Sequence, residues 1–202
     1  VSEVELRLTQ SKLAQTGPLL ITHWGLSGPA VLRLSAWGAR VLHDQQYQAP
    51  LQINWLPAWR LPALEDHLRA LKAAQARRTP GSQALFDLPL RLWQRLLAAA
   101  GSGDGQRWGD LSKAQMQRLL TELKAGVYTI AGKGPFKEEF VTCGGVTLDE
   151  VNFKTMESRC CPGLYLAGEI LDVDGVTGGF NFQSAWTTGW LAGNALSRRG
   201  ES

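Results

Sequence analysis

The most informative stretch of the chain is PGLYLAGEILDVDGVTGGFNFQSAWTTGWLAG, residues 162–193. It contains, in order, an apolar segment ending at Gly168–Glu169, a turn with Asp172 and Asp174, the pair Gly178–Gly179, and a helix-like segment. A helix N-terminus offers free backbone N–H groups and a partial positive charge to a polar cofactor. Glycine allows the backbone to approach such a ligand closely. The stretch therefore predicts a cofactor site at the start of a helix.

A purely structural interpretation of this stretch is the alternative: a strand, a loop and a helix whose glycines serve only tight turns. That interpretation accounts for Gly163 and Gly168. It does not account for three acids, a glycine pair and Asn181 in one loop, because no local turn needs so many such residues. Their density favours contact with a cofactor.

The composition is that of a folded globular protein, with 44% hydrophobic and 19% charged residues. The formal net charge of +3 is too small to predict nucleic-acid binding by the chain as a whole. There is no bilayer-length apolar run and no signal-peptide pattern, so we expect a cytoplasmic protein without a membrane partner. The chain starts at Val1 in the middle of a strand-like pattern, which suggests a fragment of a longer protein.

Two candidate sites give way to simpler interpretations. Cys143, Cys160 and Cys161 form neither a disulfide framework nor a metal-ligand pattern, so we expect reduced thiols and no metal. The segment GSGDG, residues 101–105, follows a helical pattern and lacks the Lys-Ser/Thr of a P-loop, which makes it a linker. His23 could touch a substrate, although a lone histidine in a loop is more often structural.

The first 60 residues show mainly strand patterns, from which we predict a small, mostly β part crossed by one helix. The predicted strands are Val4–Leu8, Pro18–Thr22, Arg40–His43 and Leu51–Trp55. The predicted helix starts at Pro29 and ends near Trp37, with Ala30, Leu34 and Trp37 facing inward.

The pattern changes to helical spacing at Leu61 and predicts three helices before residue 127. The second is expected to be capped by Asp87. The third is expected to start at Ser112 with a capping box to Gln115 and to end at Gly126. Alternation at residues 127–131 and extended residues 139–142 then predict a β-hairpin.

Three motifs carry a resemblance to a known family. They are THWGLSGPA at 22–30, TCGGVTLDEVNFKTMES at 142–158, and GLYLAGEILDVDGVTGGFNFQSAWTTGWLAG at 163–193. In order and spacing, the chain resembles the BaiN/YhiN-type NAD(P)/FAD-dependent oxidoreductases, within the two-dinucleotide-binding-domain flavoprotein superfamily.

The resemblance implies an α+β fold of several parts. Residues 1–60 and 127–141 would form a β-barrel-like insert, and residues 61–126 a helical subdomain similar to a helix–two-turn–helix fold. Residues 142–202 would return to complete the carboxy-terminal part of an α/β FAD-binding domain.

The resemblance also implies which residues face the flavin. Gly168 and Glu169 would end the last strand of the FAD domain, with Glu169 or Asp172 facing the ribityl or pyrophosphate region. Backbone N–H groups of 178–182 would lie near the flavin pyrimidine edge and stabilise negative charge on the reduced ring. The implied cofactor-binding residues are Gly168, Glu169, Asp172, Gly178, Gly179, Phe180, Asn181 and Phe182. Thr22, His23 and Cys143 are expected on the substrate side, and the family commonly has alanine where Cys143 stands.

One family feature is missing, because no GxGxxG fingerprint for the ADP half of FAD occurs in these 202 residues. We therefore expect FAD, with NAD(P)H as an allowed reductant, in a longer protein. For this chain alone we expect weak FAD binding or none, and no activity. The alternative is a non-enzymatic binding or regulatory module whose helical part contacts nucleic acid. Its basic cluster, Arg69, Lys72, Arg77 and Arg78, is equally explained by a solvated helix face. No residue identifies the small-molecule substrate or the oligomeric state.

Overall fold

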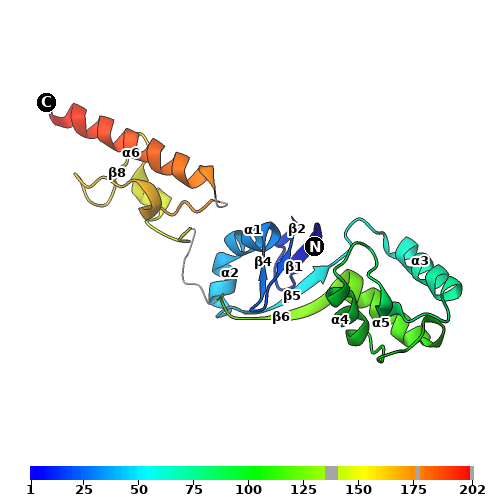
Figure 1. Cartoon of the computed structure of the whole chain (residues 1–202). Helices are drawn as coiled ribbons and strands as arrows, with labels where there is room; N and C mark the ends of the chain where they lie inside the picture. The colour runs from blue at the N-terminus through cyan, green and yellow to red at the C-terminus, as the bar shows by residue number, and fades with distance from the viewer. Residues whose placement is uncertain (135–140, 176–177, 201–202) are drawn as a thin grey trace. The chain divides into compact units, whose positions relative to one another are not determined.

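The computed structural model describes residues 1–134, 141–175 and 178–200. The chain forms two compact units (Figure 1). The first consists of Val1–Leu34 and Gln45–Lys133, and the second of Ser35–Asp44 and Gly134–Ser202. The first unit combines a sheet with a group of helices, and the second is built around one long helix. The predicted α+β class is confirmed, while the finer division into subdomains stays a prediction.

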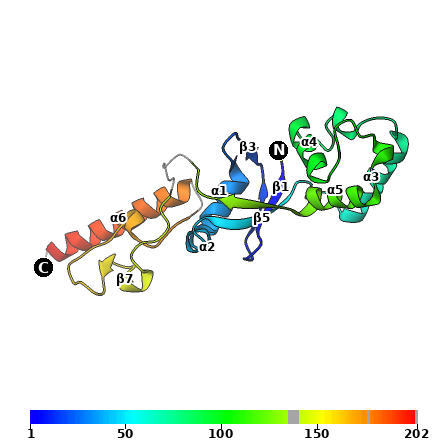
Figure 2. The same ribbon diagram turned by 90° about the horizontal axis from the view of Figure 1, so that it is seen from below.

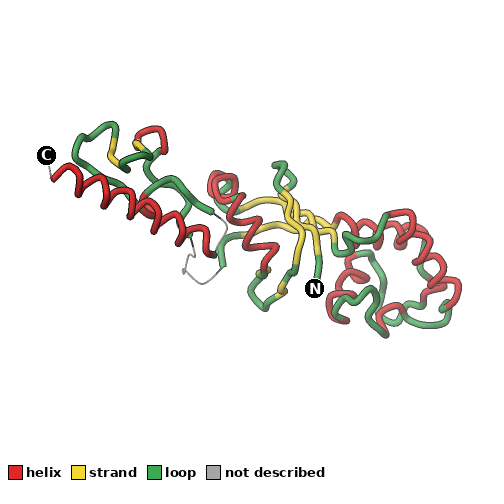
Figure 3. The backbone as a smooth tube through the Cα atoms, turned by 90° about the horizontal axis from the view of Figure 1, so that it is seen from above, coloured by secondary structure: helices red, strands yellow, loops and turns green. Residues whose placement is uncertain are grey.

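An antiparallel sheet forms the centre of the first unit (yellow in Figure 3). Its strands are β2 (Ala14–Gly17), β1 (Val4–Leu8), β5 (Gln48–Asn54) and β6 (Gly126–Ala131), in that order. Alternate residues of β1 and β5 are buried, as the period of a strand requires. Two predicted strands, at 4–8 and 51–55, are thereby confirmed. The predicted strand at 18–22 is shorter, β3 (Leu20–Ile21), and pairs with β4 (Leu26–Ser27).

The helix predicted from Pro29 is confirmed as α1 (Pro29–Trp37), with Ala30 and Leu34 buried. The inward placement of Trp37 is wrong, because 58% of this residue is exposed. The predicted strand at 40–43 is also wrong, since these residues belong to helix α2 (Ala39–Asp44). Four residues cannot separate strand from helix by periodicity, and alanine, arginine and leucine all favour a helix here.

The helical part of the first unit contains the three predicted helices (Figure 2). They are α3 (Leu61–Ala74), α4 (Leu90–Ala99) and α5 (Lys113–Ala125), with short 3₁₀ turns η1 (Pro80–Ser82) and η2 (Trp108–Asp110). The capping box of Ser112 and Gln115 is present as predicted. Asp87 does not cap α4, because Pro89 occupies that position. Proline disfavours helical geometry at the preceding residue, Leu88, so the helix does not extend back toward Asp87.

Aromatic side chains form the core of this helical part. Phe86 contacts Trp93 edge to face, with ring centroids 6.0 Å apart, and Trp93 in turn contacts Trp108. Trp93 is fully buried, and its Nε1–H donates to the carbonyl oxygen of Pro80 at 2.8 Å. The tryptophan thereby ties helix α4 to the η1 turn.

The strand β6 pairs with β5 through six residue pairs, from Gly126 opposite Ile53 to Ala131 opposite Gln48. The first arm of the hairpin predicted for 127–142 is present as β6. The hairpin as a whole is not tested, because residues 135–140 lie outside the described part of the chain. Gly126 ends α5, as predicted, and it is also the first residue of β6.

The second unit packs short segments against helix α6 (Gly179–Gly200). These segments are η3 (Leu148–Glu150), β7 (Val151–Asn152), β8 (Glu157–Ser158) and η4 (Gly168–Ile170). Their core consists of Val151, Met156, Leu166, Leu171 and Ala192. The strand predicted to end at 168–169 is only a single bridge between Tyr165 and Glu157, because no longer partner strand lies beside it among the described residues. None of the helices in the described part of the chain has the length and apolar character needed to cross a membrane.

Candidate functional site

The start of helix α6 is open. A Cβ atom placed on Gly178 or Gly179 would meet no other atom within 4 Å. Phe180 and Phe182 beside them are 76% and 67% exposed. The described residues supply no hydrogen-bond acceptor for the backbone N–H groups of 179–181. A ligand can therefore reach the positive end of a 22-residue helix along bare backbone.

Asn181 fixes the acidic loop to this helix start. Its Oδ1 accepts a hydrogen bond from the Gly175 N–H at 3.0 Å, and its Nδ2 donates to the Gly175 carbonyl at 3.4 Å. The side chain is thus engaged within the protein. The backbone N–H of Asn181 bonds to no described residue outside its helix, so it remains available to a cofactor.

Gly168 is held from the middle of the same helix. Its N–H donates to Thr188 Oγ1 at 2.9 Å, and the Thr188 hydroxyl donates to the Ser184 carbonyl at 2.7 Å. Thr188 is the buried polar residue of α6, and Gly168 adopts a φ of +76°, which suits glycine. Glu169, next in the chain, is exposed. The two implied cofactor residues therefore differ, since Gly168 is anchored and Glu169 is free to meet a ligand.

Arg40 is a member of this site that sequence reasoning missed. Its Nη2 lies 2.6 Å from Asp172 Oδ1, and the neighbouring carboxylate raises the pKa of the guanidinium above its usual value. The pair lies 132 positions apart in the sequence, so no local spacing could reveal it. Arg40 neutralises one of the acids of the loop, which lessens its repulsion of an anionic ligand.

Cys143 interacts electrostatically with Arg40, Asp172 and Asp174. Partial burial raises the pKa of its thiol first, and a hydrogen bond to Asp174 and the charge of that carboxylate raise it further. Arg40 acts in the opposite direction, and lowers the pKa of the thiol. A raised pKa keeps the thiol protonated near neutral pH, so Cys143 is poorly suited to be a nucleophile.

The Asp174→Asn variant should therefore lower the pKa of Cys143 and speed its alkylation by iodoacetamide at pH 7 to 8. Arg40→Ala should slow alkylation, because it removes a positive charge that favours the thiolate. Rates come from peptide mass spectrometry, with Asp149→Asn as a charge-matched control that is not one of these interacting residues. Equal rates in Asp174→Asn and in the unmodified chain would contradict this arrangement.

Thr22 and His23, predicted on the substrate side, belong to the first unit. The Thr22 hydroxyl donates to the Gly25 carbonyl at 2.9 Å and accepts from the Gly25 N–H, which closes a tight turn. His23 is exposed at the tip of this turn. Their relation to the residues predicted to face the flavin also stays a prediction.

The residues present fit a flavin nucleotide better than a metal. Bare backbone N–H groups, a glycine pair and an exposed carboxylate suit a ligand with both anionic and hydroxyl groups. Among residues 1–134, 141–175 and 178–200, no group of three or more His, Cys, Asp or Glu side chains could hold a metal ion.

Comparison with known proteins gives a consistent set of relatives. Residues 1–141 match the family described as HI0933-like protein barrel and H2TH domain. The chain is 34% identical over 203 residues to a 3-dehydro-bile acid delta(4,6)-reductase of Clostridium scindens, which covers 98% of the chain and 48% of that relative.

Two further relatives are ribosomal RNA dihydrouridine synthases. The Escherichia coli protein is 35% identical over 178 residues, and these cover 88% of the chain and 42% of the relative. The Haemophilus influenzae protein is 31% identical over 185 residues, which cover 90% and 42%. The chain thus spans a little under half the length of these curated relatives. By the family match and these relatives, the chain belongs to the HI0933-like family of the BaiN/YhiN flavoprotein type.

Proposed function

We propose that this chain supplies the flavin-facing half of an FAD-dependent reductase that saturates a carbon–carbon double bond conjugated to a carbonyl group. The names of the relatives support this class of reaction. A 3-dehydro bile acid carries a ketone beside its double bonds, and uridine carries a carbonyl beside the bond that becomes saturated in dihydrouridine. Both substrates thus offer a double bond that is activated toward hydride.

The observation that carries the proposal is the open start of helix α6. A Cβ atom on Gly178 or Gly179 would meet nothing within 4 Å, and the N–H groups of 179–181 find no acceptor among the described residues, which supports their use by a cofactor. When bound, the flavin supplies hydride transfer. The chain's share is to stabilise negative charge with these N–H groups and the helix dipole.

The surrounding residues shape this half-site. Asn181 keeps the loop against the helix, Arg40 offsets the charge of Asp172, and exposed Glu169 can accept hydrogen bonds from ribityl hydroxyls. Because the 202 residues contain no GxGxxG turn, the ADP half of FAD would be held by a segment outside them. Family membership is the support for NAD(P)H as the hydride donor.

The test compares this chain with the product of its whole gene. The whole product should be yellow and release FAD on denaturation, while the 202-residue chain should not bind FAD at submicromolar concentration. Gly179→Val should lower the FAD affinity of the whole product about tenfold or more, equal to about 1.4 kcal/mol, because a branched side chain closes the open backbone. Ser197→Val, an exposed change in the same helix, is the control.

The reaction is tested with the flavin-loaded product and NAD(P)H under anaerobic conditions. A 3-keto-4,6-diene steroid and a uridine-containing RNA are offered, and mass spectrometry detects the gain of two hydrogen atoms. A folded but colourless whole-gene product would favour the non-enzymatic alternative. A yellow product that reduces neither compound would contradict the proposed reaction.

A further inference from the structure

Positive charge is concentrated in the helical part of the first unit. Residues 61–126 contain ten lysines and arginines and six acids, a net charge of +4, whereas the whole chain has +3. The remaining residues therefore carry no net positive charge. A charge that looks small over the chain becomes substantial on one subdomain, which is the usual mark of a polyanion-binding surface.

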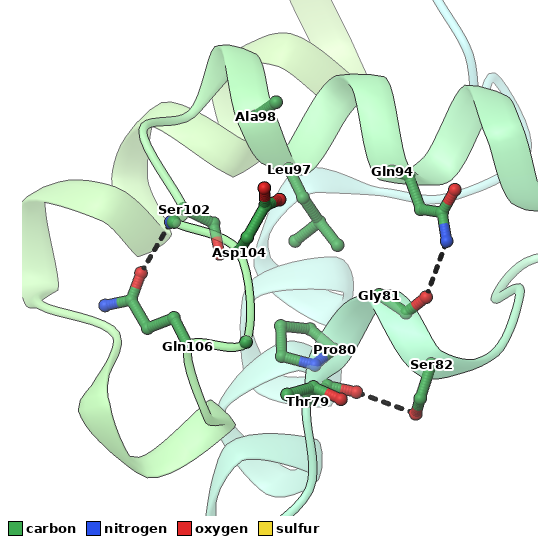
Figure 4. Close-up of a pocket in the computed structure, with 12 residues that line it drawn as sticks. Thr79, Pro80, Gly81, Ser82, Gln94, Leu97, Ala98, Ser102, Asp104 and Gln106 are labelled. Carbon is green, nitrogen blue, oxygen red and sulfur yellow. Dashed lines mark hydrogen bonds between the residues drawn. The ribbon is translucent and has the colours of Figure 1, made fainter.

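A pocket of about 370 Å³ lies within this helical part (Figure 4). Its wall comes from the η1 turn, from helix α4 and from the loop after α4. Polar groups of Thr79, Ser82, Gln94, Ser102, Asp104 and Gln106 line it, together with the apolar Pro80, Leu97 and Ala98 and three glycines. The volume is at the small end of the range for ligand sites, about 300–1,000 Å³, and suits one nucleoside.

Five arginines neighbour the pocket-lining residues in the sequence or on the same helix face, and are called the rim arginines: Arg77, Arg78, Arg91, Arg95 and Arg107. Arg77 and Arg78 directly precede the first wall segment, and Arg107 directly follows the last. Arg91 and Arg95 lie on the stripe of α4 that also carries the lining residue Ala98, because residues three, four and seven apart share a helix face.

All five rim arginines are exposed. In the described part of the chain none makes an ion pair or a side-chain hydrogen bond. The other basic residues of the helical part are often engaged: Arg69 pairs with Glu65, and Lys124 donates to the Leu56 and Trp59 carbonyls. The solvated-face explanation thus fits Arg69, whereas the rim arginines keep all their donors for a ligand.

The pocket is rigidly built. Trp93 Nε1 donates to the Pro80 carbonyl at 2.8 Å, and Gln94 Nε2 donates to the Gly81 carbonyl at 2.9 Å. The Trp108 N–H donates to the Arg78 carbonyl at 2.8 Å, which brings the first and last wall segments together. The backbone of the wall segments is therefore held in place before any ligand arrives, while the arginine side chains remain unbonded to other described residues.

The chemistry of the pocket differs from that of the rim arginines. The Asp104 carboxylate would repel a phosphate, and like the amide and hydroxyl groups of the lining it can bond to a base edge or a ribose 2′-hydroxyl. Pro80 and Leu97 offer apolar surface to the face of a base. The guanidinium groups outside suit phosphates, which they bind with two parallel hydrogen bonds.

We propose that the arginine-rimmed pocket binds single-stranded RNA, with one nucleoside in the pocket and the flanking phosphates on Arg77, Arg78, Arg91, Arg95 and Arg107. A single strand is required because an unpaired base can turn into a pocket, whereas the bases of a duplex cannot. The choice of RNA rests on the proposed function, in which RNA is one of two substrate classes. The site itself needs no flavin.

The test uses the full 202-residue chain and a fluorescein-labelled, uridine-containing RNA oligonucleotide, followed by fluorescence anisotropy at increasing salt. The logarithm of the affinity should fall with the logarithm of the salt concentration, with a slope of up to about −3.5 for five contacts at about −0.7 each. Arg91→Ala with Arg95→Ala should reduce the slope by about 1.4 and lower the affinity tenfold or more at low salt.

Two controls separate this site from general charge. Lys12→Ala with Lys154→Ala removes the same charge elsewhere and should leave binding within twofold of the unmodified chain. Asp104→Asn should keep the salt slope but reduce the preference for RNA over DNA of the same sequence. Circular dichroism confirms that each variant is folded.

The proposal is overturned if the chain does not bind the RNA at low salt. It is also overturned if the lysine control loses as much affinity as the arginine variant, or if single-stranded DNA binds as tightly as RNA. These results are distinct from those of the flavin test. A whole-gene product that reduces the steroid but binds no RNA would retain the proposed reaction and lose this site. A colourless product that binds RNA through the rim arginines would retain this site and lose the proposed reaction.

Discussion

Trp93→Ala should destabilise the first unit by about 3–5 kcal/mol, the range for deleting a fully buried tryptophan. The side chain is completely buried between Phe86 and Trp108, so its removal leaves a cavity that rigid neighbours cannot fill. It also leaves the Pro80 carbonyl without its donor. Since a domain is stable by only about 5–15 kcal/mol, much of that stability would be lost.

Hydrogen–deuterium exchange of the α4 and α5 amides measures this effect. Protection should fall roughly 100- to 4,000-fold, since each 1.4 kcal/mol is tenfold. Trp93→Phe keeps an aromatic ring but loses the bond to Pro80, and should cost about 1–3 kcal/mol. Leu90→Ala, at a residue of α4 that is 41% exposed, is the control and should stay within about 0.5 kcal/mol. A Trp93→Ala chain with unchanged protection would disprove the central place of this tryptophan.

Gly145→Ala should have the largest effect in the second unit. A Cβ atom at Gly145 would lie 2.6 Å from both the Ile170 oxygen and the Leu171 carbonyl carbon, and these are backbone atoms that cannot rotate away. The two segments are joined there by Val146 N–H to Ile170 O at 2.8 Å and Asp172 N–H to Val146 O at 3.0 Å. Forcing them apart should cost about 3 kcal/mol, the upper part of the range for overpacking.

Amide exchange and alkylation of Cys143 measure the effect of Gly145→Ala. The amides of Val146 and Asp172 should lose protection from exchange. Cys143 should be alkylated faster, because burial is the main reason that its pKa is raised. Gly189→Ala is the control: it meets nothing within 4 Å and lies inside a helix, where alanine should stabilise by about 0.5–1 kcal/mol. Similar behaviour of the two variants would refute the close approach at Gly145.

Local features of the fold could be predicted from the sequence. The alternation at Val4–Leu8 and the capping box at Ser112 depend only on neighbours within a few residues, and both are present. Helix α2 was not predicted, because six residues carry too little periodicity to indicate a helix. A strand was predicted where the structure has only the bridge at Tyr165, because a strand depends on its partners as much as on its own sequence.

The candidate site was predictable in its backbone and not in its side chains. The glycine pair and the helix start lie next to each other in the sequence, and the structure leaves them open. Arg40 and Gly145 owe their importance to segments far along the chain, namely Asp172 and Ile170–Leu171. Asn181 is expected to offer its backbone N–H to the cofactor, which stays a prediction, and the bond of its side chain to Gly175 was not foreseen. Contacts over such distances are set by tertiary packing.

The interleaving of the two units sets an order for folding on the ribosome. The first unit is complete once Lys133 has been synthesised, while the segment Ser35–Asp44 belongs to the second unit and must wait. Arg40 is made 132 residues before its partner Asp172, an interval of roughly 7–26 s at 5–20 residues per second. The second unit can therefore assemble only after the first has had time to fold. Slow codons between these two residues would lengthen the time during which α2 stays without the rest of its unit.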